Sequence, residues 1–316
     1  MAEPTKRSPF DPAILDRLAG LDFVARTVVE GFLAGGHRSP RKGSSPEFAQ
    51  HREYAPGDDL RHLDWRIFAK SQRLVVKEFH EESNLVAHIA LDTSGSMAFG
   101  SSAARTGGWS KLDYGRWVAA ALGHLILGQR DLVGLVHFDT ALRAALPPGG
   151  GQPQRQALIG LLEEAEPGGE TDEGPCFAEL AGQLPGRGVA ILISDFLGDL
   201  DPMFRGLEAL LAAGHEPLLL QVLDRRELDF DYEGYLRLED LEGGPALKVD
   251  ARVLAEAYRE EVDAHQAALG RRAANLGLDL VTMVTDQGVD TALAAYLARR
   301  TAGASRSSGR SAGVAR

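Results

Sequence analysis

From residue 85 onward, continuous apolar runs alternate with longer segments whose apolar residues recur every three to four positions. The runs have the length of buried strands, and the longer segments have helical periodicity. Strands separated by helices in this way predict a mainly parallel sheet covered on both faces, a doubly wound α/β domain. We expect strands at 85–91, 132–138, 141–146, 189–193, 217–223 and 280–284, and helices at 111–129, 154–165, 203–213, 253–275 and 289–299.

The pattern divides the chain into three parts. Residues 1–84 carry an amphipathic pattern at 11–33 and then a block of alternating acids and bases, which predicts an N-terminal helical segment with an ion-pair-rich extension. Residues 85–298 form the α/β domain, in which 234–250 is expected as a hairpin added at a sheet edge. Residues 299–316 are rich in Arg, Ser, Gly and Ala, a composition that predicts a disordered basic tail.

The composition narrows the classes of function. The 34 basic and 45 acidic residues give a net charge of -11, which argues against nucleic acid as a partner. We expect no transmembrane segment, because no apolar run approaches the roughly 18 residues that a membrane span needs. The N-terminus lacks the apolar stretch of a secretory signal, and there is a single cysteine, so we expect a cytoplasmic protein.

Oxygen-bearing side chains follow two of the predicted strands and lie in one loop between helices. These residues are Asp92, Ser94 and Ser96 after strand 85–91, Thr171 in the sequence "GGETDEG", and Asp195 after strand 189–193. Ligands of open α/β sheets bind beyond the carboxyl ends of the strands, where the strand order reverses. Because alternate side chains of an extended segment point to the same side, the first three can converge on one point. Gly95 allows the tight turn between the two serines.

Hard oxygen ligands select Mg²⁺, or Mn²⁺ or Ca²⁺, over zinc and copper. The carboxylates of Asp92 and Asp195 about balance a divalent cation, which leaves attraction for a carboxylate offered by a protein partner. The residues therefore predict a divalent-metal site completed from outside. An alternative is that Asp92 caps the helix that begins near Lys111 or forms an Asx turn, while the serines satisfy nearby backbone N–H groups.

The motifs "DTSGS", "ETDEG" and "ISDF" resemble the metal-ion-dependent adhesion site of von Willebrand factor type A domains. The resemblance implies that Asp92, Ser94, Ser96, Thr171 and Asp195 hold Mg²⁺ directly or through water. Upstream, the segment from Gly43 to Glu82 resembles the signature of the bacterial family called domain of unknown function 58. Members of that family are commonly encoded beside AAA+ ATPases of the MoxR type, which implies such an ATPase as a partner in protein maturation or complex assembly.

The block before residue 73 places acids and bases in close alternation: Asp58, Asp59, Arg61, His62, Asp64, Trp65 and Arg66. One interpretation is an internal network of ion pairs, with Trp65 as an anchoring aromatic. The other is a docking face, because a surface Trp flanked by Arg has the composition of an interface hot spot.

Three functions follow from these patterns. The first is a non-enzymatic, metal-dependent protein-binding module that works as an adaptor. The second is a Mg²⁺-dependent hydrolase of phosphatase type, in which Asp92 or Asp195 acts as nucleophile or base. Against it, the chain lacks a Walker-type loop and a G-x-S-x-G elbow, and Ser94 stands where aspartyl-phosphate enzymes carry a second carboxylate. The third is a scaffold whose site holds no metal.

Overall fold

The computed structural model describes residues 48–54, 64–79, 85–100, 110–238, 241 and 246–287. These residues fall into two compact units, a small one before residue 85 and a main one from Leu85 onward. The expected helices at 11–33 and 289–299, and the tail 299–316, lie outside the described residues.

The main unit is built on a six-stranded sheet in the order β10-β7-β6-β3-β4-β5. Every pairing is parallel except that of β4 with the edge strand β5. From β3 the chain continues to β4 on one side, whereas β6 pairs with β3 on the other side, so the strand order reverses at β3. The predicted doubly wound, mainly parallel α/β fold is confirmed. Its strands are β3 (Val86–Asp92), β4 (Leu132–Phe138), β5 (Leu142–Gly149), β6 (Val189–Ser194), β7 (Glu216–Leu223) and β10 (Asp279–Val284).

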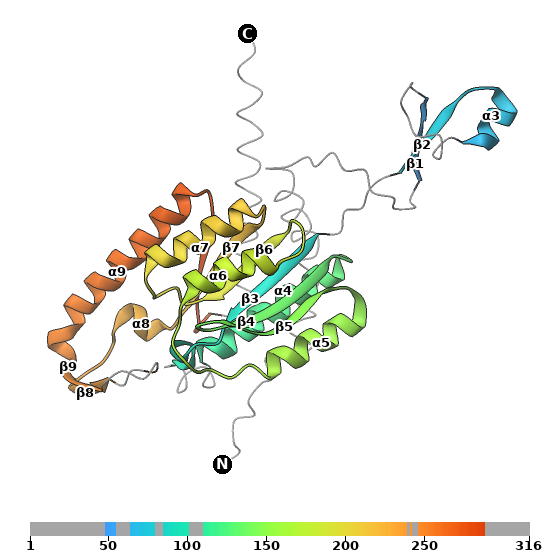
Figure 1. The fold of residues 1–316 in the computed structure, drawn as a ribbon. Coiled ribbons are helices and arrows are strands. Elements are labelled where there is room, and N and C mark those ends of the chain that lie inside the picture. The colour runs from blue at the N-terminus through green and yellow to red at the C-terminus, as the bar shows by residue number, and fades with distance from the viewer. Residues whose placement is uncertain are drawn as a thin grey trace, which may run out of the picture. The chain divides into compact units, whose positions relative to one another are not determined.

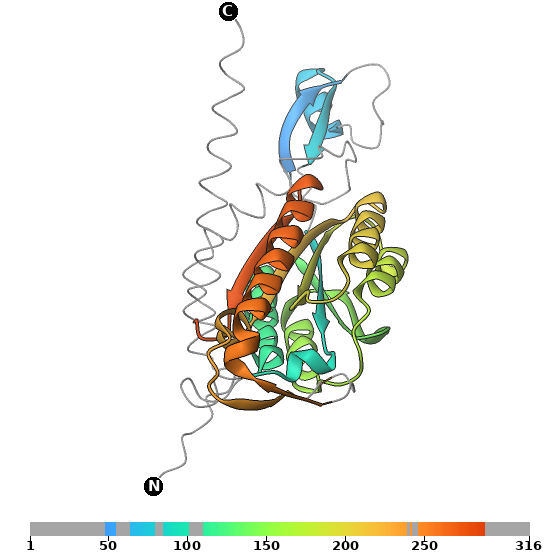
Figure 2. The ribbon, with the colours of Figure 1, turned by 90° about the vertical axis from the view of Figure 1, so that its left-hand side faces the viewer.

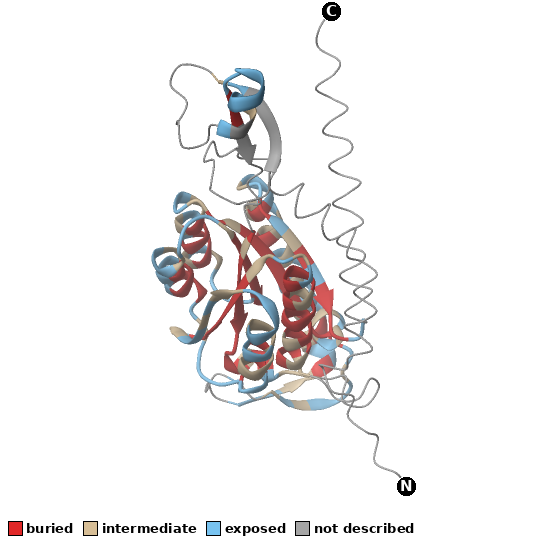
Figure 3. Ribbon diagram, turned by 90° about the vertical axis from the view of Figure 1, so that its right-hand side faces the viewer, coloured by how far each residue is buried: buried red, intermediate tan, exposed pale blue. Residues whose placement is uncertain are grey.

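Helices cover both faces of this sheet (Figures 1 and 2). One apolar core lies between the sheet and the pair α4 and α5, and a second lies between the sheet and α6, α7 and the end of α9. The central strands β3, β4, β6 and β7 are buried, whereas the edge strand β5 and the outer helix faces are largely exposed (Figure 3). The helix bounds are α4 (Lys111–Gly128), α5 (Gly151–Glu163), α6 (Glu173–Gln183), α7 (Leu200–Ala212), α8 (Arg225–Asp229) and α9 (Ala251–Asn275), with a 3-10 turn η2 (Gly95–Ala98).

The hairpin expected at a sheet edge is placed differently. Strands β8 (Tyr235–Leu238) and β9 (Leu247–Asp250) pair antiparallel as the sequence predicts, but they form a two-stranded sheet of their own. Instead of joining β10 or β5, the hairpin leads directly into α9, where Asp250 is the N-cap and accepts from the backbone N–H of Arg252. Leu236 of the hairpin packs against a small separate cluster around Phe230, whereas Tyr235 and Leu247 are exposed.

The small unit consists of the antiparallel strands β1 (Phe48–Glu53) and β2 (Val75–Phe79) and the short helix α3 (Trp65–Ser71). Asp64 is buried at the start of α3, where its carboxylate accepts from the backbone N–H of Ile67 at 3.2 Å. The backbone N–H of Asp64 donates to the carbonyl of Val75, which ties the helix to β2.

Two buried histidines in the sheet lead us to predict that the stability of the fold decreases in acid. Burial lowers the pKa of His88, on β3, and of His137, on β4, to about 4. Because the unfolded chain binds these protons near pH 6.5, the stabilisation present above that pH is lost as the pH falls toward 4. Between pH 7 and pH 5, we expect each histidine to lower the free energy of unfolding by about 2 kcal/mol.

Urea unfolding of the wild type and of His88→Leu at pH 7 and pH 5 measures this dependence. The variant should lose less stability on acidification, since one buried imidazole is gone. Equal losses in the two proteins would show that His88 does not contribute.

Candidate metal site at the carboxyl ends of β3 and β6

The candidate site begins where β3 and β6 end side by side. In their parallel register Leu91 pairs with Ile193, so Asp92 and Ser194 leave the sheet at the same level. The hydroxyl of Ser194 donates to Asp92 Oδ2 at 2.6 Å, and the backbone N–H of Ser94 donates to Asp92 Oδ1 at 2.8 Å. Both oxygens of a fully buried carboxylate are thereby fixed in position.

The loop after Asp92 brings three of the other predicted residues together. The hydroxyl oxygens of Ser94 and Ser96 lie 3.2 Å apart, and the Ser96 hydroxyl donates to Asp195 Oδ2 at 2.8 Å. The side chain of Thr93 turns away and donates to the carbonyl of Phe138. Four of the five predicted residues therefore form one hydrogen-bonded group across two strand ends.

Thr171 lies in a loop that packs against the same turn. The backbone N–H of Gly168 donates to the carbonyl of Thr93 at 2.9 Å, and the backbone N–H of Gly95 donates to that of Gly169 at 2.9 Å. Thr171 is partly buried two residues further along. The predicted convergence of the three segments is thus seen in the backbone, whereas their role as metal ligands stays a prediction.

The alternative that Asp92 caps the following helix is wrong. Ser110 is the N-cap of α4, where it forms a capping box with Asp113. The Asx-type bond from the Ser94 backbone to Asp92 is present. The serine hydroxyls contact each other and Asp195, and Ser94 makes no side-chain cap bond at η2. An Asx turn therefore explains one oxygen of Asp92 but leaves the arrangement of the serines unexplained.

Burial, and then repulsion by Asp195, raises the pKa of Asp92 to about 7, although bonds from Ser194 and Ser94 oppose the rise. Within the described part of the chain, no Lys or Arg side chain forms an ion pair with Asp92. A buried carboxylate without a cationic partner is unfavourable, so a nearby cation would stabilise its charged form.

A buried lysine at this site was missed by the sequence analysis. Lys111, the first residue of α4, is 1% exposed, and its Nζ lies 2.6 Å from Asp195 Oδ2 and 2.6 Å from Glu227 Oε1. Burial alone would lower the pKa of Lys111, but the two carboxylates outweigh it and raise the pKa, so the ammonium stays charged. Glu227 is itself held in the capping box of α8 by the backbone N–H of Asp224.

A second missed group is Glu173, in the first turn of α6. It is 3% exposed, and its Oε1 has no hydrogen-bond partner among the described residues. Burial, and then repulsion by Asp92, raises the pKa of Glu173 to about 8. Its position two residues after Thr171 was the available signal, although "ETDEG" does not show which of its acids turns inward.

The turn after Asp195 is held in a strained conformation. Phe196 is buried with φ at +49°, a left-handed backbone that costs a non-glycine residue on the order of 1 kcal/mol or more. His265 of α9 contacts the Phe196 carbonyl oxygen at 2.8 Å, and the backbone N–H of Leu197 donates to Asp195 Oδ1 at 3.3 Å. These bonds fix the direction in which the Asp195 carboxylate points.

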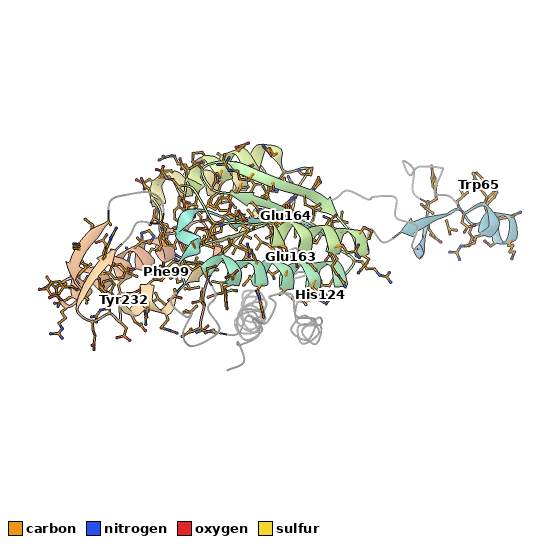
Figure 4. The ribbon with its side chains drawn as sticks, turned by 90° about the horizontal axis from the view of Figure 1, so that it is seen from below. Trp65, Phe99, His124, Glu163, Glu164 and Tyr232 are labelled. Carbon is orange, nitrogen blue, oxygen red and sulfur yellow. The ribbon has the colours of Figure 1, made fainter. Side chains whose placement is uncertain are left out.

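The acid-base block of the small unit is described only in part. Asp58, Arg61 and His62 lie outside the described residues, as does the side chain of Arg66. Trp65, which is labelled in Figure 4, is 60% exposed. Its ring contacts that of Phe68 edge-on, with ring centroids 6.2 Å apart. The structure thus shows an exposed Trp in place of the expected anchoring aromatic, and the choice between network and docking face stays a prediction.

No cluster of three or more His, Cys, Asp or Glu side chains in the described ranges is arranged to hold a metal ion. The predicted ligand set does not require one, because it consists of two carboxylates and three hydroxyls. Zinc-type sites built on His or Cys are therefore not seen in these ranges.

The sequence from residue 50 to residue 268 matches the family described as "Protein of unknown function DUF58". The chain belongs to this family. An uncharacterized protein of Mycobacterium tuberculosis is 28% identical over 305 residues, which cover 93% of this chain and 92% of the relative. The predicted family is confirmed, and the bacterial character of its relatives agrees with it.

Among solved structures, BatB from Bacteroides thetaiotaomicron is similar with a TM-score of 0.43 and 18% identity, covering 71% of this chain and 100% of its own. A von Willebrand factor type A protein from Catenulispora acidiphila has a TM-score of 0.34 and 16% identity, covering 59% of this chain and 43% of its own. Among the described residues, no helix has both the length and the apolar character needed to span a bilayer.

The buried ion pairs of Lys111 predict a large effect of its removal. In Lys111→Met, Asp195 and Glu227 lose their cationic partner inside the protein. We expect the free energy of unfolding to fall by about 3–5 kcal/mol, the range for breaking one side of a buried pair.

Urea unfolding measures this loss, with Arg225→Met as the control. The Arg225–Asp286 pair lies in the same unit with side chains 43% and 33% exposed, so its loss should cost less than about 1 kcal/mol. Similar losses in the two variants would contradict a structural role for the Lys111 pairs.

Proposed function

We propose that this protein is a non-enzymatic, divalent-metal-dependent protein-binding module. Asp92, Ser94, Ser96, Thr171 and Asp195 would hold Mg²⁺, or Mn²⁺ or Ca²⁺, at the carboxyl ends of β3 and β6. The observation that carries the proposal is the fully buried Asp92 carboxylate, which has no ion pair in the described structure and is joined through the Ser94 loop to Asp195.

The chemistry of the residues fits a hard cation. Each proposed ligand offers a carboxylate or hydroxyl oxygen, which are the donors preferred by Mg²⁺ and Ca²⁺. The hydroxyls of Ser94 and Ser96 currently bond each other and Asp195, so they already point at a common region. When bound, the cation would supply an open coordination position for a carboxylate from a protein partner.

Side chains beside the site support recognition of a partner. Leu197 follows Asp195 by two residues and is 39% exposed. Leu241, between β8 and β9, is 47% exposed, and its carbonyl oxygen would lie 2.3 Å from a methyl group added at Gly95. These two exposed leucines lie beside the position where the partner's carboxylate would bind. They favour a partner whose acidic residue has apolar neighbours. From the family resemblance, we propose an AAA+ ATPase of the MoxR type as that partner.

The two alternatives fit less well. For a phosphatase-like hydrolase, Ser94 stands two residues after Asp92, where aspartyl-phosphate enzymes carry a second carboxylate. The metal-free scaffold is favoured by Lys111, whose ammonium neutralises Asp195 without a metal. That lysine leaves Asp92 without a cationic partner, however, so the site is only partly neutralised by the protein itself.

The proposal predicts that metal and partner binding fail together when Asp92 is changed. We expect the wild type to bind Mn²⁺ and Mg²⁺ in isothermal titration calorimetry, and Asp92→Ala to lose this binding by at least a hundredfold. Pull-down of the MoxR-type ATPase encoded in the same genome should succeed in Mg²⁺ and fail both in EDTA and with Asp92→Ala.

Asp229→Ala is the matched control, because Asp229 is an exposed acid at the end of α8 and its loss changes the net charge equally. If the wild type retains the ATPase in EDTA, and if Asp92→Ala also retains it, the metal plays no part in binding the partner. Turnover of a phosphoester that disappears in Asp92→Asn would support the hydrolase instead.

A further inference from the structure

Glu173 is a buried acid that the five proposed ligands do not explain. Its side chain is 97% buried, and Oε1 has no hydrogen-bond partner within the described residues. No described Lys or Arg forms an ion pair with it. An unpartnered carboxylate oxygen in the interior carries a large desolvation penalty, so its retention calls for a ligand.

The carboxylate of Glu173 lies against the loop that follows Asp195. A methyl group added at Gly198 would come within 2.7 Å of Glu173 Oε2, so the side chain contacts the backbone three residues after Asp195. The loop ahead of α6 also packs against the turn after Asp92, where the backbone N–H of Gly168 donates to the carbonyl of Thr93 and that of Gly95 donates to the carbonyl of Gly169. The first turn of α6, which carries Glu173, therefore follows a loop bonded to the turn after Asp92 and contacts the loop after Asp195.

The helix that carries Glu173 is held in place. A methyl group at Gly174 would lie 2.6 Å from the carbonyl oxygen of Pro202, and one at Gly206 would lie 2.6 Å from the carbonyl oxygen of Gly174. The backbones of α6 and α7 thus approach too closely for any other residue. Because the first turn of α6 cannot shift easily, Glu173 stays directed at the site despite the repulsion.

We propose that Glu173 is an outer carboxylate of the cation site, which accepts a hydrogen bond from a water molecule on the bound divalent cation. This inference rests on the proposed function. A direct bond to the cation is less favourable, because no three acids in the described ranges are arranged to hold a metal together. As an outer group, Glu173 would orient the hydration of the cation and add a third negative charge around it.

A purely structural role for Glu173 makes a different prediction. Acids in the first turn of a helix interact favourably with its N-terminal dipole. The N-cap residue Asp172 makes no side-chain cap bond, so Glu173 is the alternative candidate for this effect. In that case the loss of its charge would lower the stability of the metal-free protein and leave metal affinity unchanged.

The test measures Mn²⁺ and Mg²⁺ affinity by isothermal titration calorimetry on the full chain, together with the thermal midpoint in EDTA. Glu173→Gln keeps the shape of the side chain and removes its charge. We expect its affinity for Mn²⁺ to fall by about tenfold or more, the usual effect of losing an outer-shell partner. The midpoint in EDTA should not fall, because Oε1 of Glu173 has no hydrogen-bond partner to lose among the described residues.

Glu179→Gln is the control, since Glu179 is exposed on the same helix and bonds only Gln183 among the described contacts. Glu173→Asp, which keeps the charge on a shorter side chain, should lie between wild type and Glu173→Gln. Wild-type affinity in Glu173→Gln would overturn the assignment of Glu173 alone. Absence of Mn²⁺ and Mg²⁺ binding by the wild type would overturn the proposed function as well.

Discussion

The parallel pairing of β3 with β6 is the constraint on which the candidate site depends. These two strands are distant in sequence, yet their register sets Leu91 opposite Ile193 and brings Asp92 next to Ser194. The strand order reverses at β3, which is the position at which open α/β sheets bind their ligands. A register slip of one residue would move Ser194 and Asp195 along the sheet relative to Asp92, so the pairing of the two strands fixes the site geometry.

Lys111 connects this geometry to the rest of the main unit. Its ammonium joins Asp195 after β6 to Glu227 of α8, while its backbone begins α4. Across the site, His265 holds the strained Phe196 turn from α9. The position of Asp195 is therefore determined by contacts from three helices, as a preorganised ligand position requires.

The predicted bounds of β6 differ from the observed ones by one residue. The hairpin β8–β9 was predicted as a local turn but placed wrongly, since its turn residues specify the reversal and carry no information on which sheet it joins. Its destination is decided by packing around Phe230.

The candidate site was predictable only where ligands follow strands in sequence. Asp92 and Asp195 could be placed because the ends of neighbouring parallel strands meet at one edge. Lys111, Glu173 and Glu227 could not, because charged residues at helix starts are usually exposed and their sequence neighbours do not distinguish the buried ones. Their roles arise from α4, α6 and α8 converging at the same edge of the sheet.

These added charges change the kind of partner that the site can attract. Two carboxylates were expected, but the structure adds Glu227, which shares the Lys111 ammonium with Asp195, and Glu173, which contacts the loop after Asp195. With these four acids ionised and Lys111 charged, the sum is -3, and a divalent cation would leave -1. An external carboxylate would then gain from direct ligation at short range but would be weakly repelled on approach. Since the chain as a whole also carries -11, we expect the carboxylate of the proposed partner to lie on a basic surface.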